Sequence, residues 1–240
     1  MNTTISKNTH LMLHAARTPM LYLCSCLIGL STSITQAGII SLSGDVEMLA
    51  PPFSVQEGAV ESDSAARLIL EREGFVLPSN VNVDITSSGI FDEVIELTPG
   101  SISAGTLVNS YLIHADSAGF FEFDGTIVSA EEILGVIVTE DNLQASHAIV
   151  GSPSTTYPVT GSVDATRAPL FLGGPLSTIT DRITLSLPDT LVFHLDTVSS
   201  GGPTYDHVRI ITAAVPEPST LTMLAIGVLT LGLVYRRRSR

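Results

Sequence analysis

Histidine and serine are the side chains of this 240-residue chain best suited to catalysis, but their spacing gives no catalytic pattern. The histidines of the middle region are single and far apart in sequence, at His114, His147, His194 and His207. Serine is abundant, yet no G-x-S-x-G sequence surrounds any of the serines. Neither H-E-x-x-H nor a cysteine and histidine cluster is present, so a zinc site has no support. We expect no catalytic residue and no enzyme; a secreted hydrolase is the alternative without a motif.

Acidic residues near predicted strand ends are the best candidates for metal ligands. Calcium prefers oxygen ligands from loops. No D-x-D-x-D-G loop groups these carboxylates, so we expect no cofactor and interpret them as solubilising charge, with a Ca²⁺ site as the alternative. The residues are Asp116, Asp124, Glu131, Glu132, Asp181 and Asp206.

Carbohydrate binding would need exposed aromatic rings, and few are available. The chain has no tryptophan and only 5% aromatic residues. Tyr157 and Tyr205, each in a predicted loop beside a proline, are the candidates for stacking on a sugar. The phenylalanines expected in the core instead are Phe121, Phe123, Phe171 and Phe193.

The middle of the chain is strongly acidic. Between Gly38 and Val215 lie 23 of the 24 acidic residues and five of the 11 basic ones, a formal charge of −18. The only lysine, Lys7, lies outside this stretch. Nucleic-acid binding depends on Lys and Arg that displace counterions, so DNA and RNA are excluded as partners.

Hydrophobic residues alternate with polar ones through the middle region, which predicts β-strands. The clearest case is a hairpin of residues 181–187 and 191–198, with a turn at Pro188 and Asp189. Residues 62–73 fit a strand or a helix, and a strand is favoured. The run from Ile133 is apolar on both faces and predicts a central covered strand, and Asp124-Gly125 predicts a tight turn. Further strands are predicted at 81–85, 106–115, 120–123 and 207–213.

Many short strands with turns between them predict an all-β fold, an antiparallel β-sandwich of jelly-roll-like type. It would occupy residues 38–214. The two ends of the chain have a different composition and are not expected to belong to it.

The N-terminus has the organisation of a secretory signal peptide. Lys7 and Arg17 precede a short apolar run, which is followed by small residues that end at Ala37. We expect cleavage at Ala37, which removes residues 1–37 together with the only cysteines, Cys24 and Cys26. The exported domain then has no disulfide. The alternative is an N-terminal membrane anchor, for which the apolar run is short.

The C-terminus predicts one transmembrane helix, at residues 219–235. These 17 uncharged residues would span about 25 Å as a helix, most of a roughly 30 Å hydrocarbon layer. A core helix is the alternative, but it would need apolar neighbours on every side. The basic residues that follow, in 236–240, would stay in the cytoplasm as stop residues: Arg236, Arg237, Arg238 and Arg240.

Pro216, Glu217 and Pro218 stand directly before this helix. The order of VPEPST, apolar helix and YRRRSR in residues 215–240 resembles the PEP-CTERM sorting signal of Gram-negative, exopolysaccharide-producing bacteria. The resemblance implies recognition by exosortase, a membrane-embedded cysteine protease or transpeptidase, and then release to the cell surface or extracellular matrix. No Leu-Pro-x-Thr-Gly motif supports the sortase route of Gram-positive bacteria.

Residues 40–213 also resemble a recurring passenger domain of PEP-CTERM proteins, through sequences such as NSYLIHAD, ILGVIV and DRITLSL. No activity is established for that group, so no functional residue is carried over. We expect a non-enzymatic exported protein, held transiently in the membrane and linked to exopolysaccharide and biofilm. The alternative is a carbohydrate- or calcium-binding module that follows the same route.

Overall fold

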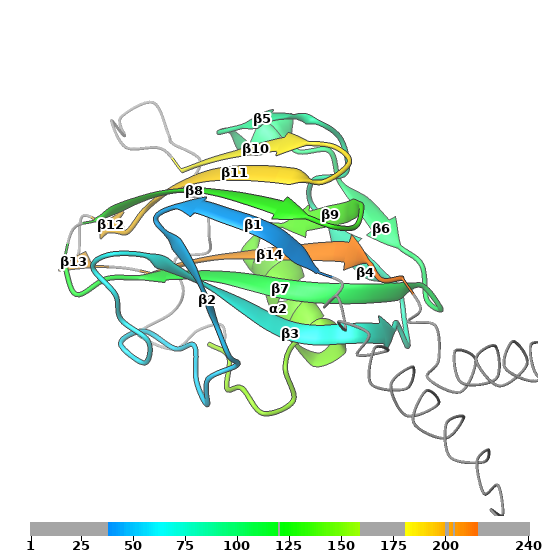
Figure 1. Ribbon diagram of the computed structural model, residues 1–240, viewed down its shortest axis with the longest axis horizontal. Helices are drawn as coiled ribbons and strands as arrows, with labels where there is room; N and C mark the ends of the chain where they lie inside the picture. Colours follow the sequence, from blue (N-terminus) through cyan, green and yellow to red (C-terminus); the bar gives the residue numbers. More distant parts are fainter. Residues whose placement is uncertain (1–37, 120, 159–180, 200–201, 204, 216–240) are drawn as a thin grey trace, which may run out of the picture. The chain divides into compact units, whose positions relative to one another are not determined.

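The computed structural model describes residues 38–119, 121–158, 181–199, 202–203 and 205–215 (Figure 1). The chain divides into two compact units, Met1–Gln36 and Ala37–Arg240, and every described residue belongs to the second. Ala37, the Pro216-Glu217-Pro218 motif, the predicted helix 219–235 and the arginines after it lie outside the described residues. Among those described, no helix combines the length and apolarity needed to cross a membrane.

Two five-stranded sheets dominate the described part of the chain (Figure 1). The first has the order β1-β8-β11-β10-β5, and the second has the order β2-β3-β7-β14-β9. The pairs β4-β6 and β12-β13 form two smaller sheets. The bounds are β1 Ile39–Gly44, β2 Val46–Leu49, β3 Ala66–Val76, β4 Val81–Val83, β5 Gly89–Phe91, η1 Val94–Glu96, β6 Gly100–Ile102, β7 Leu107–Asp116, β8 Glu122–Ser129, β9 Ile133–Ile137, α2 Glu140–Val150, β10 Arg182–Ser186, β11 Thr190–Asp196, β12 Val198–Ser199, β13 Gly202–Pro203 and β14 Tyr205–Ala213.

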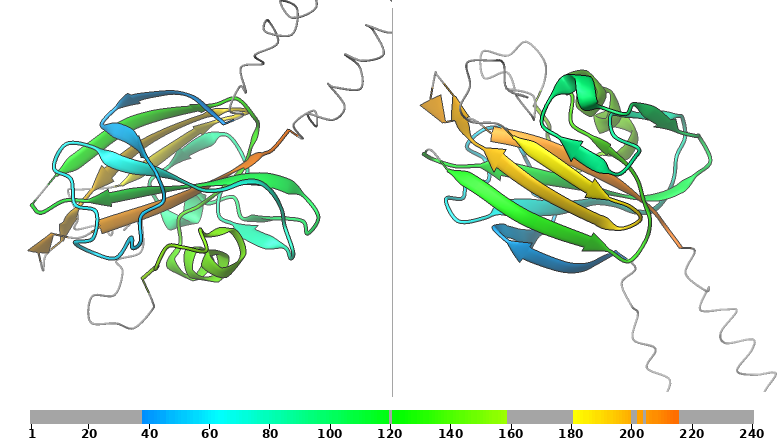
Figure 2. Two further views of the ribbon diagram at one scale, coloured as in Figure 1. Left: turned by 60° about the horizontal axis from the view of Figure 1, so that its bottom comes forward. Right: turned by 90° about the horizontal axis from the view of Figure 1, so that it is seen from above.

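The main apolar core joins the inner faces of the two large sheets. Leu68, Ile113 and Val208 reach it from the second sheet, and Phe123 and Phe193 reach it from the first. In β8 and β11 the buried residues alternate with more exposed ones, as a period of two requires, whereas β7 and β14 are buried on both faces. Helix α2 lies on the opposite face of the second sheet, away from the first (Figure 2).

Most predicted strands are confirmed. The predicted hairpin is the antiparallel pair β10-β11, with its turn at residues 187–189. The segment for which a strand was favoured over a helix is β3. The segments at 81–85, 106–115 and 207–213 correspond to β4, β7 and β14. The predicted all-β character therefore holds among the described residues, apart from α2 and the one-turn helix η1.

The prediction of purely antiparallel sheets is wrong at one pair, because β2 and β3 run parallel. The cause lies at Gly44 and Asp45, where the chain leaves the first sheet and enters the second. Gly44 has a φ of +80°, a conformation that glycine adopts without strain. The Asp45 N–H donates to the Asp124 carbonyl at 2.6 Å, and the Asp45 carbonyl accepts from the Ala66 N–H at 2.9 Å. This corner directs β2 alongside β3 in the same direction.

The predicted turn at Asp124-Gly125 is also wrong, since both residues lie inside β8. Gly125 pairs with Phe193 of β11, and a Cβ at Gly125 would stand 2.2 Å from the Phe193 ring. The glycine therefore marks a close approach within the sheet, where an aromatic ring lies over the backbone.

Gly125→Ala is expected to destabilise the domain by at least about 1–3 kcal/mol, because the new methyl group overlaps the Phe193 ring. Urea denaturation of the exported protein measures this change. Gly119→Ala is the matched control, since no atom lies within 4 Å of its Cβ position. Equal stability of the two variants would contradict this account of β8.

The run from Ile133 had been predicted as a central strand, and that position is wrong, because β9 is the last strand of its sheet. Its outer edge is closed by Ile85, which exchanges backbone hydrogen bonds with Val136. The helix that follows, α2, was not predicted. Asp84 fixes the start of the helix by accepting from the N–H groups of Val138 and Thr139, the two residues before it, at 2.7 and 2.8 Å. A carboxylate at this end also suits the helix dipole.

Candidate functional site

A row of polar side chains crosses the outer face of the second sheet and is covered by α2 and the loop after it. We call it the polar stripe. Most of these side chains come from β3, β7 and β14. The register of the three strands puts their positions in line on one face of the sheet, with Arg209 opposite Leu112 and Leu112 opposite Ile69. Its members are Glu71, Ser110, His114, Ser146, His147, Tyr157, His207 and Arg209.

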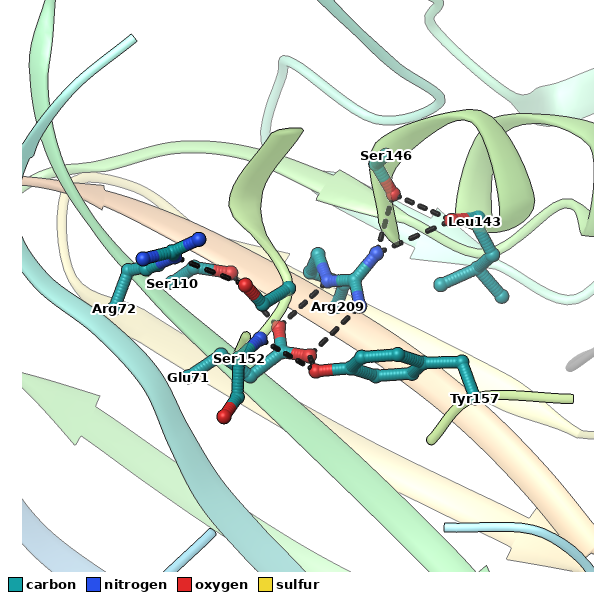
Figure 3. Close-up of polar contacts among 9 residues, drawn as sticks. Glu71, Arg72, Ser110, Leu143, Ser146, Ser152, Tyr157 and Arg209 are labelled. Carbon is teal, nitrogen blue, oxygen red and sulfur yellow. Dashed lines mark hydrogen bonds and ion pairs between the residues drawn. The ribbon is translucent and has the colours of Figure 1, made fainter. Parts of the chain in front are cut away.

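Arg209 and Glu71 form a fully buried ion pair at its centre (Figure 3). The Arg209 Nε and Nη2 donate to the two Glu71 carboxylate oxygens at 2.7 and 2.8 Å. Ser110 also donates to this carboxylate, at 2.9 Å. Burial alone would lower the pKa of Arg209, but the charge and hydrogen bonds of Glu71 outweigh it, so the pKa is raised. Arg209 therefore keeps its positive charge inside the protein.

The ion pair ties α2 and its following loop to the sheet (Figure 3). Arg209 Nη1 donates to Ser146 Oγ and, at 3.2 Å, to the Leu143 carbonyl, both on α2. From the loop, the Tyr157 hydroxyl donates to Glu71 at 2.5 Å and accepts from the Ser152 N–H at 2.7 Å. Arg72 Nε donates to the Gly151 carbonyl at 2.9 Å.

Burial, together with the Glu71 carboxylate, raises the pKa of Tyr157 above its ordinary value. The phenol therefore remains protonated and continues to donate across the whole physiological range. With the Arg209 guanidinium and the Ser110 hydroxyl, it supplies the donors that a buried carboxylate needs.

His114 and His207 lie side by side on β7 and β14, with His114 Nδ1 and His207 Nε2 2.7 Å apart. These histidines are 93 residues apart in the sequence, and the pairing of β7 with β14 brings them together. Asp116 approaches the His114 ring, with 3.5 Å between its Oδ2 and His114 Nε2. Burial lowers the pKa of His207 well below its ordinary value, and the charges of His114, His147 and Arg209 lower it further. His207 is thus a neutral imidazole.

His147 lies on α2, and its ring stacks on Tyr157 with 4.3 Å between the centroids. Burial and the positive charge of Arg209 lower the pKa of His147 to about 3. Two histidines of the polar stripe, His147 and His207, are therefore held neutral.

Acidification is expected to destabilise the domain through these two histidines. The unfolded chain binds protons at an ordinary pKa of 6.5, whereas folded His147 binds one only near pH 3. The contribution of these histidines to the free energy of unfolding is therefore fully present above pH 6.5. It falls as the pH drops towards 3, by up to about 1.4 kcal/mol per pH unit for each histidine.

Urea denaturation of the exported protein at pH 7, 6 and 5 measures this slope. His147→Gln removes one of these two groups and should make the slope shallower. A variant of His147 with the full slope would contradict the account.

The contacts of the polar stripe act as a clamp, because they hold α2 and the loop after it on the second sheet. Within the described residues Ser110 donates to the Glu71 carboxylate, and Ser146 donates to the Leu143 carbonyl and accepts from Arg209, so neither hydroxyl meets a histidine base. Outside the stripe, His194 Nδ1 lies 2.9 Å from Asp124 on the outer face of the first sheet. No serine of the described residues bonds to that pair, so it does not form a triad.

The acidic residues considered for calcium are separated in the structure. Asp116 accepts from the Gly58 N–H and Asp181 from the Asp196 N–H, at 2.9 and 2.8 Å. Glu131 is buried, whereas Glu132 is exposed. Within the described ranges, no three His, Cys, Asp or Glu residues stand close enough together to hold a metal ion.

The two tyrosines proposed as sugar-stacking residues do not present open rings. Tyr205 is only 3% exposed, and the Tyr157 ring is stacked by His147. That prediction is wrong because both side chains pack on the outer face of the second sheet. The exposed aromatic among the described residues is Phe53, at 91%, on the loop after β2. Phe123 and Phe193 are buried as expected, and Phe121 packs against the core.

The polar stripe was not recognised in the sequence, although single signals were present. Glu71 directly follows the apolar run 68–70, and Arg209 stands between Val208 and Ile210, which is typical of charges that pair inside a protein. The alternation of β14 also puts His207 and Arg209 on one face. Their partners could not be inferred, because 138 residues separate Glu71 from Arg209.

The described domain ends where the C-terminal segment begins. Strand β14 stops at Ala213, and the Ala214 N–H still donates to the Leu107 carbonyl at 3.0 Å. Residues 214–238 match the family model of the PEP-CTERM protein-sorting motif. The chain carries a PEP-CTERM sorting motif. The motif supports an exported protein with a membrane-anchored precursor that exosortase processes. Among curated proteins and among solved structures, none matches this chain.

Proposed function

We propose that residues 38–214 form a β-sandwich passenger domain, jelly-roll-like in type, that works as a non-enzymatic structural component outside the cell. The observation that carries the proposal is the PEP-CTERM motif directly after β14. The host is a Gram-negative bacterium, and the destination is its cell surface or exopolysaccharide matrix. The charge of −18 between Gly38 and Val215 favours a soluble, well-dispersed protein in such a matrix.

Two features of the domain support a structural rather than a catalytic role. The charged groups at the centre of the polar stripe bind one another, so they stabilise the cover of the second sheet instead of facing a substrate. The mature domain also lacks cysteine, so its stability does not depend on oxidation after export.

A carbohydrate-binding module is the second candidate, and Phe53 is the observation that favours it. Its ring is 91% exposed on a loop that is pinned to the rest of the domain by the bridge between Ser54 and Thr156. An exposed, anchored aromatic ring offers an apolar face to a partner. A calcium-binding module is a variant of this second candidate. The experiment below distinguishes the two by comparing binding in Ca²⁺ and in EDTA.

Fractionation and sedimentation with the host's exopolysaccharide test both candidates. The structural proposal predicts that the processed protein is found in the surface or matrix fraction and does not bind the purified polymer with either Ca²⁺ or EDTA. If the protein sediments with the polymer and Phe53→Ala does not, the carbohydrate-binding module replaces the structural proposal. If the protein sediments with the polymer only in Ca²⁺, the domain also has an ion site. Protein that stays in the cytoplasm would refute both.

A further inference from the structure

Glu131 is a buried carboxylate that forms no ion pair with any of the described residues. It is 8% exposed, and none of the described residues donates a hydrogen bond to its Oε2. Its own N–H donates to Ser129 Oγ at 3.1 Å, which fixes the residue between β8 and β9. Burial raises the pKa of Glu131, because the ionised form loses its hydration. Such a group is destabilising unless a donor or a positive charge reaches it.

Tyr111 and Gly38 border the same place. Tyr111 is 1% exposed, and burial, then the charges of Glu131 and Glu73, raise the pKa of its phenol. The Glu131 carboxylate therefore acts electrostatically on the Tyr111 hydroxyl. A Cβ at Gly38 would stand 2.7 Å from that hydroxyl oxygen. The Gly38 carbonyl accepts from the N–H of Ala130, the neighbour of Glu131, at 2.6 Å.

The two arginines of β3 are engaged with other groups. Arg67 pairs with Glu47, and Arg72 donates to the Gly151 carbonyl on the outer face of the sheet. The charged groups that act on Tyr111 are Glu131 and Glu73, both negative. This corner of the domain is thus anionic, buried at Glu131 and lined by the backbone of Gly38.

Cleavage after Ala37 would leave Gly38 as the first residue. Within the precursor its nitrogen is a neutral amide with one N–H, but after cleavage it is an ammonium with a positive charge and three donors. Glycine suits the position, because a side chain there would collide with Tyr111. We propose that the α-amino group freed at Gly38 binds the Glu131 carboxylate, so that removal of the leader completes the fold of the domain. This inference rests on the proposed export and on cleavage at Ala37.

The exported chain offers an unusually direct test, because Lys7 is its only lysine and is lost with the leader. The α-amino group is then the only primary amine of the processed protein. Trace labelling with acetic anhydride, read by mass spectrometry across pH 6 to 10, reports its protonation. An α-amino group ordinarily has a pKa near 8, and pairing with Glu131 raises it. At pH 7, below both pKa values, the folded protein should label about tenfold more slowly than the same protein in urea, as a shift of about one pKa unit requires.

Glu131→Gln keeps the shape of the side chain and removes its charge. In this variant the α-amino group should label faster than in the wild type, with its pH profile shifted to lower pH. Glu132→Gln changes the exposed neighbour and should leave the profile of the wild type unchanged. If Glu131→Gln does not fold, the labelling profile of the wild type decides between pairing and burial. Pairing with the carboxylate shifts this profile to higher pH, whereas burial of the amino group without a carboxylate shifts it to lower pH.

Intact-mass measurement of the exported protein separates the possible failures. A chain that begins at Gly38 but has an ordinary or lowered labelling profile overturns the inference and leaves the proposed export in place. A chain that begins at another residue overturns both the cleavage at Ala37 and the inference. A cytoplasmic, uncleaved chain refutes the proposed export itself.

Discussion

Arg209→Met is expected to lower the free energy of unfolding by about 3–5 kcal/mol, one of the largest single-residue effects in the domain. The substitution removes the cation but leaves the Glu71 carboxylate buried among apolar neighbours of the second sheet. The hydrogen bonds from Tyr157 and Ser110 remain, but they do not replace a full positive charge. Urea denaturation of the exported protein at pH 7 measures the loss.

Removing both charges should be less harmful than removing one. Glu71→Met combined with Arg209→Met leaves no uncompensated charge, so the double variant should be more stable than either single variant. A double-mutant cycle from these proteins gives the coupling energy of the pair. Additive losses in the cycle would contradict the interpretation of the pair as a mutually neutralising unit.

Arg67→Met provides the matched control on the same sheet. Arg67 pairs with Glu47, whose side chain is 54% exposed, so water already solvates this pair. Its loss should change the free energy of unfolding by about 1 kcal/mol or less. A similar effect at Arg67 and Arg209 would indicate that burial is not the cause.

Hydrogen exchange should show where the Arg209 variant loosens. Arg209 and Glu71 reach Ser146 on α2 and Tyr157 on the following loop, while the strands below are also joined by backbone ladders. The amides of α2 and of residues 151–157 should therefore exchange faster in Arg209→Met before those of β7 do. Uniform acceleration across the domain would show that the polar stripe does not act as a local clamp.

The strands were predictable because one buried face imposes a period of two on the sequence. In β11 the residues Leu191, Phe193 and Leu195 are buried as alternation requires. Alternation does not predict which strands are neighbours. It shows which residues of a strand face the core, but not which other strand bonds to each of its edges. The placement of β9 at the end of its sheet and the parallel pair β2-β3 depend on pairings between distant segments.

Helix α2 had readable signals that were not used. Thr139 stands at its N-cap, Glu140 and Asp141 follow in the first turn, and Gly151 ends it. Its weak amphipathic pattern has a physical reason. The helix packs on the sheet through polar contacts from Arg209 to Ser146 and Leu143 as well as through apolar ones, so hydrophobic periodicity alone underestimates it.

The other large expected effect concerns sorting. Here the C-terminal tail, and not the folded domain, determines whether the protein stays in the membrane or is released. Deleting the exosortase of the producing cell should leave most of the protein in the membrane fraction, in a form that keeps its C-terminal tail. The physical reason is that an apolar segment of 17 residues followed by four arginines does not leave a bilayer unless it is cut off. Membrane fractionation with intact-mass measurement gives both location and size.

Glu217→Ala should have the same direction of effect in cells that keep the enzyme. Glu217 is the only acidic residue of the matched motif at 214–238, so the substitution removes the one carboxylate that could distinguish this segment from other apolar tails. Glu122→Ala, on the exposed outer face of β8, is the control and should be processed normally. Wild-type size and release in both the deletion strain and the Glu217 variant would mean that exosortase does not process this chain.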